Sequence, residues 1–224
     1  MSSKYSLIID FDSTILSVES LEFAATVSLK KKSNKNLILE KINYITNKAM
    51  NGEISFQESI SKRLNLMDIK ESHIKIATDK LINKVDKSFL DNLDFFKKNF
   101  NDVFIISGGF KKMIDSILKQ KTNIDWQIFG NEIIFDKETK KASLNTKNPL
   151  AYSKGKVKII KNLNLKNDII AIGDGYTDYE IKKYGLAKYF IAYTNHIKRD
   201  NVIKNADINC KNFNEVIQFL KSNY

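Results

Sequence analysis

Three short stretches of the sequence combine acidic residues, hydroxyl groups and glycines at the ends of apolar runs. They are residues 10–14 (DFDST), 107–109 (SGG) and 173–178 (GDGYTD). The apolar runs have the length of strands, and the carboxyl ends of neighbouring parallel strands meet at one edge of a sheet, where ligands bind in open α/β folds. We therefore expect the carboxylates and the serine of these stretches to face one crevice.

Carboxylates gathered in one crevice repel one another, so a positive group must offset them. A hard divalent cation with oxygen ligands fits best, and the octahedral preference of Mg²⁺ suits carboxylates, waters and a phosphate oxygen. The chain has one cysteine, and its two histidines are far apart in the sequence, which argues against a thiolate or histidine metal site. The expected cofactor is therefore Mg²⁺.

The spacing of Asp10 and Asp12 suits a division of roles in phosphoryl transfer. Two residues apart just past a strand, both side chains can point into one cleft. A carboxylate is a known nucleophile toward phosphoryl groups, and a second carboxyl can protonate the leaving oxygen and later deprotonate water. An isolated pair of this kind more often caps a turn, but the other two stretches favour the chemical interpretation.

Ser107 and the N–H groups that follow it, beginning with Gly108, stand where a helix is expected to begin, a natural place to bind phosphate. A plain strand-to-helix turn would also explain the glycines. Lys154 begins the expected helix SKGKVKIIKNL and can balance charge on phosphoryl oxygens. Lys156 and Lys158 compete for this role, and we choose Lys154 because residues further along the helix turn away.

The remaining pattern predicts a parallel sheet flanked by helices and interrupted by one helical insertion. Strand–turn–helix units repeat along the second half of the chain, whereas only helical spacing occurs from about residue 18 to residue 84. The expected fold is an α/β, Rossmann-like core over residues 1–16 and 86–224, with a helical cap domain over 17–85.

Local signals refine this prediction. Ser55 followed by Glu58 has the spacing of a capping box, and Gly52 fits a break between two helices. The stretch IFGNEIIFDKETKKASL, residues 128–144, is typical of a small antiparallel hairpin with a polar turn. Cys210 lies in an apolar-alternating stretch, which favours a buried structural thiol.

The formal charge of +11 comes almost entirely from lysine, because Arg63 and Arg199 are the only arginines. Arginine is the usual reader of bases, so a solvated lysine surface is expected rather than a nucleic-acid partner. No long uncharged apolar run predicts a membrane span, and the opening residues fit a strand better than a signal peptide. The expectation is a cytoplasmic protein without a membrane partner.

Taken together, the motifs resemble those of the haloacid dehalogenase-like phosphatases, specifically the phosphoserine phosphatase branch with a helical cap inserted after the first strand. The matching stretches, in the family's order and spacing, are DFDST at 10–14, SGGF at 107–110, KGKV at 154–157 and GDGYTD at 173–178. The resemblance covers almost the whole chain.

The resemblance implies a role for each motif residue. Asp10 is the expected nucleophile and Asp12 the general acid and base, with Ser107 and Lys154 on the phosphate. The expected Mg²⁺ ligands are Asp10, the backbone carbonyl of Asp12 and Asp174, and Asp178 is expected to support the metal site.

The insertion carries the substrate information. In the resembling branch, a glutamate and an arginine at the places of Glu19 and Arg63 hold the amino and carboxylate groups of phosphoserine. The scarcity of arginine independently suggests that Arg63 pairs with a carboxylate in a forked geometry. The alternatives are a surface helix charge for Arg63 and a first-turn acidic residue for Glu19. Met50 and Phe56 are expected as apolar walls over the substrate.

Two departures from the branch fall in the last motif. Thr177 stands where many relatives carry asparagine, and it remains a candidate substrate contact. Tyr176 is bulkier than the small residue common at its position. Both leave the expected metal chemistry intact but bear on the identity of the substrate.

The expected activity is hydrolysis of O-phosphoserine in serine biosynthesis, through an aspartyl-phosphate on Asp10. Alternatives within the class are phosphohomoserine or phosphocholine as substrate. A signalling receiver domain also combines acidic residues, a hydroxyl residue, lysine and an aspartyl-phosphate, but it has no cap and no built-in acid to speed hydrolysis. A basic nucleic-acid-binding module is disfavoured by the motifs and by the scarcity of arginine.

Overall fold

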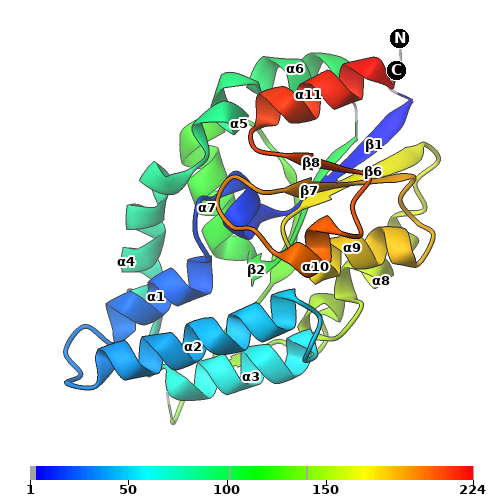
Figure 1. Ribbon diagram of the computed structural model, residues 1–224. Helices are drawn as coiled ribbons and strands as arrows, with labels where there is room; N and C mark the ends of the chain where they lie inside the picture. The colour runs from blue at the N-terminus through cyan, green and yellow to red at the C-terminus, as the bar shows by residue number, and fades with distance from the viewer. Residues whose placement is uncertain (1–3, 101, 140, 224) are drawn as a thin grey trace.

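The computed structural model describes residues 4–100, 102–139 and 141–223, and a six-stranded sheet forms its centre. The strand order is β3–β2–β1–β6–β7–β8, and every pairing is parallel (Figure 1). The strands are β1 (Tyr5–Ile9), β2 (Val103–Phe110), β3 (Gln127–Asn131), β6 (Asp168–Gly173), β7 (Tyr189–Tyr193) and β8 (Ile208–Cys210). The α/β class expected from the sequence is confirmed.

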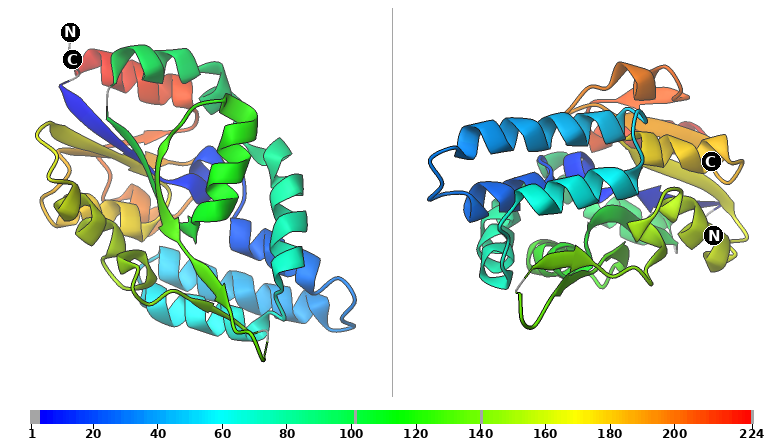
Figure 2. Two further views of the ribbon diagram at one scale, coloured as in Figure 1. Left: turned by 180° about the vertical axis from the view of Figure 1, so that it is seen from behind. Right: turned by 90° about the horizontal axis from the view of Figure 1, so that it is seen from below.

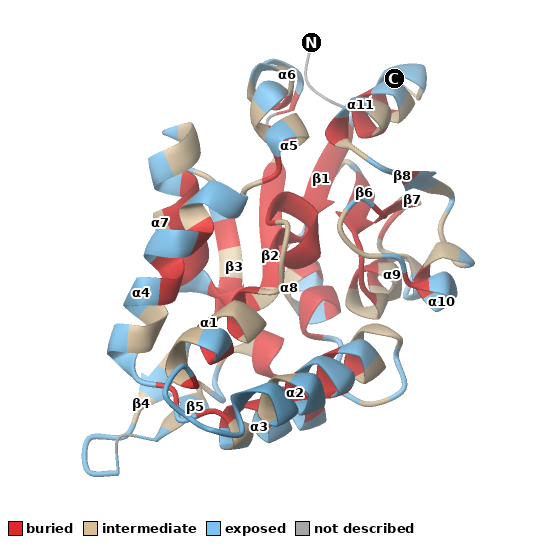
Figure 3. Cartoon of the chain, turned by 60° about the vertical axis from the view of Figure 1, so that its left-hand side comes forward, coloured by how far each residue is buried: buried red, intermediate tan, exposed pale blue. Residues whose placement is uncertain are grey.

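Both faces of the sheet are buried, which explains the continuous apolar runs of its strands. Along β1, Tyr5, Leu7 and Ile9 pack into one core and Ile8 into the other, because successive side chains of a strand point to opposite faces. Figure 3 shows that burial extends along the central strands. This packing on both faces holds β1 in place within the sheet, so the residues that follow it lie at the carboxyl edge.

Helices cover both faces of the sheet (Figure 2). The first core is closed by α5 (Lys87–Asp91), α6 (Leu93–Asn99), α7 (Lys111–Thr122) and α11 (Phe213–Ser222). The second is closed by α8 (Gly155–Leu163), α9 (Tyr176–Lys183) and α10 (Asp200–Ile203). In the first core the rings of Phe89 and Phe213 meet edge to face, with centroids 5.1 Å apart.

Four more helices lie between β1 and α5, where the sequence predicts the insertion. They are α1 (Ser20–Ser28), α2 (Lys35–Met50), α3 (Phe56–Leu66) and α4 (Glu71–Leu81). The Ser55 hydroxyl accepts a hydrogen bond from the Glu58 N–H at 3.1 Å, and Gly52 has a φ of +79° between α2 and α3. Both predicted helix boundaries are thus confirmed. Within the described ranges, no helix is long and apolar enough to cross a membrane.

The α2–α3 pair lies across the carboxyl end of the sheet (Figures 1 and 2). Short helical turns at Phe11–Ile15, Ile82–Lys84 and Pro149–Ala151 complete the helical structure of the described residues. The first of these turns follows β1 directly and is closed by a hydrogen bond from the Leu16 N–H to the Phe11 carbonyl at 2.8 Å. It brings the DFDST stretch under the inserted helices.

The predicted hairpin is confirmed only in part. β4 (Ile133–Phe135) and β5 (Ala142–Leu144) pair antiparallel, as expected. The preceding residues form β3, which pairs parallel with β2 and places Ile128 beside Ile105. Ile128 is buried in the first core, so burial in the main sheet outweighs the local alternation that suggested one longer hairpin.

Cys210 is fully buried at the end of β8. Burial raises the pKa of its thiol to about 12. The side chain is therefore a protonated, unreactive part of the core, as the sequence predicts.

The two segments that join the inserted helices to the core run side by side as an antiparallel ribbon. Leu16 and Val85 form a β-bridge, and the Asp86 N–H donates to the Ile15 carbonyl at 2.7 Å. The proposed boundaries of the cap domain, 17–85, fall at this ribbon. Any movement of the four helices relative to the sheet would therefore have to change the conformation of these two connecting segments.

Asp86 fastens the ribbon to the core. Its buried carboxylate accepts hydrogen bonds from the Tyr193 hydroxyl at 2.9 Å and the Asn195 amide at 3.0 Å, and Nε2 of His196 lies 2.9 Å away. Burial raises the pKa of Asp86, but the contacts with His196, Ser88 and Tyr193 outweigh burial and hold that pKa well below its usual range. Folding therefore favours the ionised carboxylate.

We expect Asp86→Asn to lower the free energy of unfolding at pH 7 by about 1–3 kcal/mol, because buried donors lose a charged acceptor. Since the folded-state pKa is depressed, this contribution is present above the unfolded-state pKa of about 4 and is lost as the pH falls below it. Urea unfolding at pH 7 and pH 3 measures the effect. The control is Asp91→Asn, because Asp91 is the exposed last residue of α5, the helix that Asp86 caps. A gap between wild type and variant that does not shrink at pH 3 would contradict the assignment.

Candidate active site

One cavity of about 240 Å³ lies where the carboxyl ends of β1 and β2 meet the inserted helices. Most residues singled out in the sequence line it, namely Asp10, Asp12, Glu19, Met50, Phe56, Arg63, Ser107, Gly108, Lys154 and Thr177. Asp174 and Asp178 do not line it but have carboxylate oxygens within 4.8 Å of those of Asp10. The fold thus gathers the predicted residues of the core and of the insertion at one place.

Lys156 is the lysine that reaches the acidic residues. Its Nζ donates to Oδ1 of Asp10 at 2.7 Å and to Oδ1 of Asp178 at 2.6 Å, and the residue is only 5% exposed. Burial lowers the pKa of Lys156, but the two carboxylates outweigh burial, so its pKa lies above the usual range. A charged ammonium group therefore bridges the motif after β1 and the motif after β6.

The expectation that Lys154 turns toward these carboxylates is wrong. α8 begins at Gly155, and Lys154 precedes it in the left-handed conformation, with a φ of 60°. Its exposed ammonium group lies 4.7 Å from the centre of the Tyr184 ring, at the mouth of the cavity. The helix starts one residue later than the sequence suggests, so its second residue, Lys156, faces inward.

Asp10, Asp174 and Asp178 form a buried group of carboxylates whose oxygens lie within 4.8 Å of one another. Burial raises the pKa of Asp178 to about 7; Lys156 opposes this rise and Asp10 adds to it. Burial likewise raises the pKa of Asp174 well above its usual range. A buried set of oxygen ligands with this repulsion fits a hard divalent cation, so the group can hold a metal ion.

The carboxylate of Asp12 is held at the start of α1 and is not part of that group. Its Oδ1 accepts from the Ser20 N–H at 3.1 Å and its Oδ2 from the Ser20 hydroxyl at 2.9 Å. Burial raises the pKa of Asp12 well above its usual range, and the neighbouring Glu19 and Asp10 add to the rise. The two aspartates of the first motif therefore lie in different surroundings, one beside an ammonium group and one beside a helix start.

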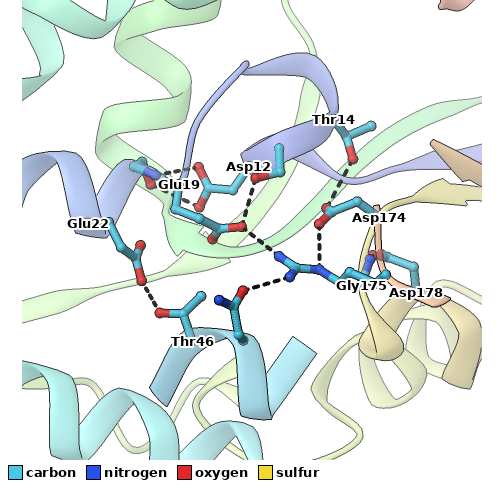
Figure 4. A network of polar contacts seen from close by, with 12 residues as sticks. Asp12, Thr14, Glu19, Glu22, Thr46, Asp174, Gly175 and Asp178 are labelled. Carbon is cyan, nitrogen blue, oxygen red and sulfur yellow. Dashed lines mark hydrogen bonds and ion pairs between the residues drawn. The ribbon is translucent and has the colours of Figure 1, made fainter. Parts of the chain in front are cut away.

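Arg199 also belongs to the site, although no motif contains it. Its Nε donates to Oδ2 of Asp174 at 3.1 Å, its Nη1 to the Asn47 side chain of α2 at 3.0 Å, and its Nη2 lies 3.5 Å from Glu19. Figure 4 shows Glu19, Asp12 and Asp174 around this network. Arg199 was detectable from the sequence, because the rarity of arginine that singles out Arg63 applies to it equally.

Glu19 is the N-cap residue of α1, and its side chain is 15% exposed beside Arg199. It accepts from the Ser13 hydroxyl at 2.8 Å. Burial raises the pKa of Glu19 to about 7, and Glu22 adds to the rise, while Arg199, Ser13 and Arg63 oppose it. Its place at the start of α1 agrees with the alternative of an acidic residue at a helix start, and its contacts with Ser13 and Arg199 add to that role.

Arg63 is 3% exposed, so it is not a surface helix charge. Its Nη1 donates to Glu22 at 2.8 Å and to the Thr46 hydroxyl at 3.1 Å, and that hydroxyl also contacts Glu22. Among the described residues, Nε of Arg63 and Oε2 of Glu22 have no hydrogen-bonding partner although both are buried. Arg63 also lines the cavity, so this buried guanidinium group lies at the side of the cavity that the insertion forms.

The inserted helices contact the core at two glycines, which have no side chain. A Cβ atom on Gly108 would lie 2.7 Å from the Phe56 ring, and one on Gly175 would lie 3.0 Å from the sulfur of Met50. Beside this contact, the Ser107 hydroxyl accepts from the Gly109 N–H at 3.1 Å. Met50 and Phe56 thus form apolar walls directly over the backbone of two motifs.

Comparison with known proteins gives a consistent result. A family model described as haloacid dehalogenase-like hydrolase matches residues 6–183. The crystal structure of a phosphoserine phosphohydrolase-like protein from Francisella tularensis is 34% identical to this chain, with a TM-score of 0.86. The match includes 98% of this chain and 99% of that one. The fold is therefore that of this group of hydrolases.

Curated relatives agree with the structural match. The chloroplastic phosphoserine phosphatase of Arabidopsis thaliana is 30% identical over 165 residues, which are 72% of this chain and 56% of that protein. The phosphoserine phosphatase of Homo sapiens is 25% identical over 211 residues, which are 93% of this chain and 89% of that protein. The chain thus spans just over half the length of the Arabidopsis protein. These similarities support a phosphoric monoester hydrolase.

The contacts of Lys156 predict a contrast between two neighbouring lysines. Lys156→Met leaves Asp10 and Asp178 without their counter-charge, so we expect the free energy of unfolding at pH 7 to fall by about 3–5 kcal/mol. Lys154→Met removes an exposed charge and should change it by less than about 0.5 kcal/mol. Urea unfolding in the presence of EDTA measures both variants, and equal effects would refute the placement of Lys156.

Proposed function

The chain belongs to the haloacid dehalogenase-like hydrolases, and from this premise we propose that it hydrolyses O-phosphoserine to serine and phosphate. One observation carries the proposal: a single small cavity contains Asp10 beside Lys156 on the core side, and Glu19 and Arg63 on the side of the insertion. The core side suits a phosphoryl group and the other side suits a zwitterionic amino acid. The similarity to phosphoserine phosphatases supports this substrate.

In the first proposed step, a carboxylate oxygen of Asp10 attacks phosphorus in line with the serine oxygen. A bond forms between phosphorus and Asp10 while the bond to the serine oxygen breaks, and the Asp12 carboxyl gives its proton to that oxygen. Lys156 offsets negative charge on the phosphoryl group. The Ser107 hydroxyl and the Gly108 N–H bind phosphoryl oxygens at the end of β2.

In the second step, Asp12 accepts a proton from a water molecule that attacks the phosphorus of the aspartyl-phosphate. The bond between phosphorus and Asp10 breaks, inorganic phosphate leaves, and both aspartates return to their starting states. The hydrogen bonds from Ser20 hold Asp12 in one orientation for both proton transfers. The insertion, with proposed bounds 17–85, acts as a cap that excludes bulk water.

Mg²⁺ is the proposed cofactor. The carboxylates of Asp10 and Asp174 and the backbone carbonyl of Asp12 would hold it, with Asp178 as support. When bound, it supplies positive charge to the phosphoryl oxygens. The acidic oxygen set fits this ion, because Mg²⁺ is held in proteins by carboxylates together with substrate phosphate.

The insertion supplies the proposed specificity. Arg63 pairs with the substrate carboxylate and Glu19 with its amino group, while Met50 and Phe56 cover the substrate and Thr177 lies at the start of α9. The cavity of about 240 Å³ is smaller than the pockets that hold drug-sized ligands. A small phosphorylated amino acid therefore fits it better than a large phosphorylated molecule.

The test of the chemistry is phosphate release from O-phosphoserine, with and without Mg²⁺. We expect Asp10→Asn to lower kcat by about 10³-fold or more, because an amide does not replace the nucleophile. Asp168→Asn is the control, since Asp168 is a half-exposed carboxylate paired with Lys188 on the surface. Near wild-type turnover by the Asp10 variant would exclude the covalent mechanism.

The substrate is tested with a matched pair of molecules. O-phosphoethanolamine is O-phosphoserine without its carboxylate, so Arg63→Lys should lower kcat/KM for phosphoserine about 10–100-fold through loss of the forked pairing, and should hardly change it for phosphoethanolamine. Lys62→Met, at the exposed neighbouring position, is the control. An equal loss on both molecules would show that Arg63 only supports the structure. A parallel comparison with phosphohomoserine and phosphocholine ranks the alternative substrates.

A further inference from the structure

The turn after α2 rests on the ring of Tyr176, at the start of α9. We propose that Tyr176 sets an upper limit on substrate size, because its ring closes the cavity against Gly52 of the cap. This inference rests on the proposed phosphatase function and adds a specificity-determining residue to it. Both residues line the cavity, and they come from opposite sides of it.

The contact is close because Gly52 has no side chain. A Cβ atom on Gly52 would lie 2.8 Å from Cγ, 2.9 Å from Cδ2 and 3.0 Å from Cδ1 of Tyr176. These are the atoms on one side of the ring, so the ring packs directly against the backbone of the turn. The φ of +79° at Gly52 also suits glycine and strains other residues.

The ring of Tyr176 is held from its own side of the site. Its hydroxyl accepts a hydrogen bond at 2.8 Å from Nζ of Lys183, which lies seven residues further along α9, about two helical turns away. Its ring meets the Tyr179 ring edge to face, with centroids 5.7 Å apart. Tyr179 in turn packs on Phe190 of β7. These contacts hold the Tyr176 side chain in one position on the core.

Neighbouring contacts keep the same end of α2 against the core. The Asn201 amide donates to the Asn51 carbonyl at 2.8 Å, and Arg199 donates to Asn47 at 3.0 Å. On the inner side, the sulfur of Met50 lies against Gly175. These contacts hold the end of α2 against the core, so a ligand larger than the cavity has to move the turn away from Tyr176.

This geometry predicts which change relaxes the limit. O-phosphotyrosine carries the amino and carboxylate groups of O-phosphoserine but adds an aromatic ring. Tyr176→Ala should raise the ratio of kcat/KM for phosphotyrosine to that for phosphoserine by about 10-fold or more, the range that pocket size usually controls. Tyr176→Phe keeps the ring and should leave the ratio within about twofold of wild type.

Tyr44→Ala is the matched control, because Tyr44 is exposed on α2 and does not line the cavity. It should behave as wild type on both substrates. An unchanged ratio in Tyr176→Ala, or an equal rise in Tyr44→Ala, would overturn the proposal.

A double-mutant cycle tests the contact itself. Gly52→Ala should lower kcat/KM for phosphoserine, because the methyl group meets the Tyr176 ring, and the loss should be smaller in the Tyr176→Ala background. Backbone strain at Gly52 is the same in both backgrounds, so it cancels from the comparison. Losses of equal size in the two backgrounds would show that the turn and the ring do not act together.

Failure of this inference is distinct from failure of the proposed function. If wild type releases no phosphate from either substrate, the phosphatase proposal and the size limit both fall. If wild type hydrolyses phosphoserine but the variants show neither the changed ratio nor the coupling, only the role of Tyr176 is refuted.

Discussion

The rest of the structure depends on neutralising carboxylates that the fold buries at one edge of a sheet. Parallel strands deliver Asp10 and the motif with Asp174 and Asp178 to the same depth, and burial opposes their charge. Lys156 supplies a positive charge there, since its ammonium group lies at hydrogen-bonding distance from both Asp10 and Asp178. It also ties α8 to the end of β1 and to the first turn of α9, so the same contact that balances charge fixes the geometry of the proposed nucleophile.

The second constraint is that the inserted helices, the proposed cap, lie over this site and stay connected to the core. Its two connecting segments pair with each other at Leu16 and Val85, and Asp86 fastens one of them to the loop after β7. That loop also carries Arg199, which reaches across to Asn47 on the cap. The connecting ribbon and the contact between Arg199 and α2 are therefore neighbours in the fold, and Arg199 links α2 to the acidic group through Asp174.

Most of the fold and much of the site could be predicted from local sequence, because strand ends, glycines and acidic residues are adjacent in the chain. The failures arise where long-range packing decides. The choice of Lys154 over Lys156 depends on where α8 begins, and there Gly155 packs so closely on Leu150 that a Cβ atom would lie 2.7 Å from the Leu150 backbone. Arg199 follows a strand without any motif, so only its rarity among lysines could have revealed it. β3 was assigned to a hairpin because burial of Ile128 in the main sheet is not a local property.

The use of arginine in a chain that otherwise uses lysine has a physical consequence for binding. In the structure Arg63 pairs with Glu22, and Arg199 lies between Glu19 and Asp174, so each buried arginine already has a carboxylate partner. A zwitterionic ligand brings one negative and one positive group, and it can engage Arg63 and Glu19 without changing the net charge of the cavity. A ligand with only one of these charges adds a net charge to a buried setting, which costs more than in water. Charge balance in the cavity thus supports the proposal that the substrate is an amino acid phosphate.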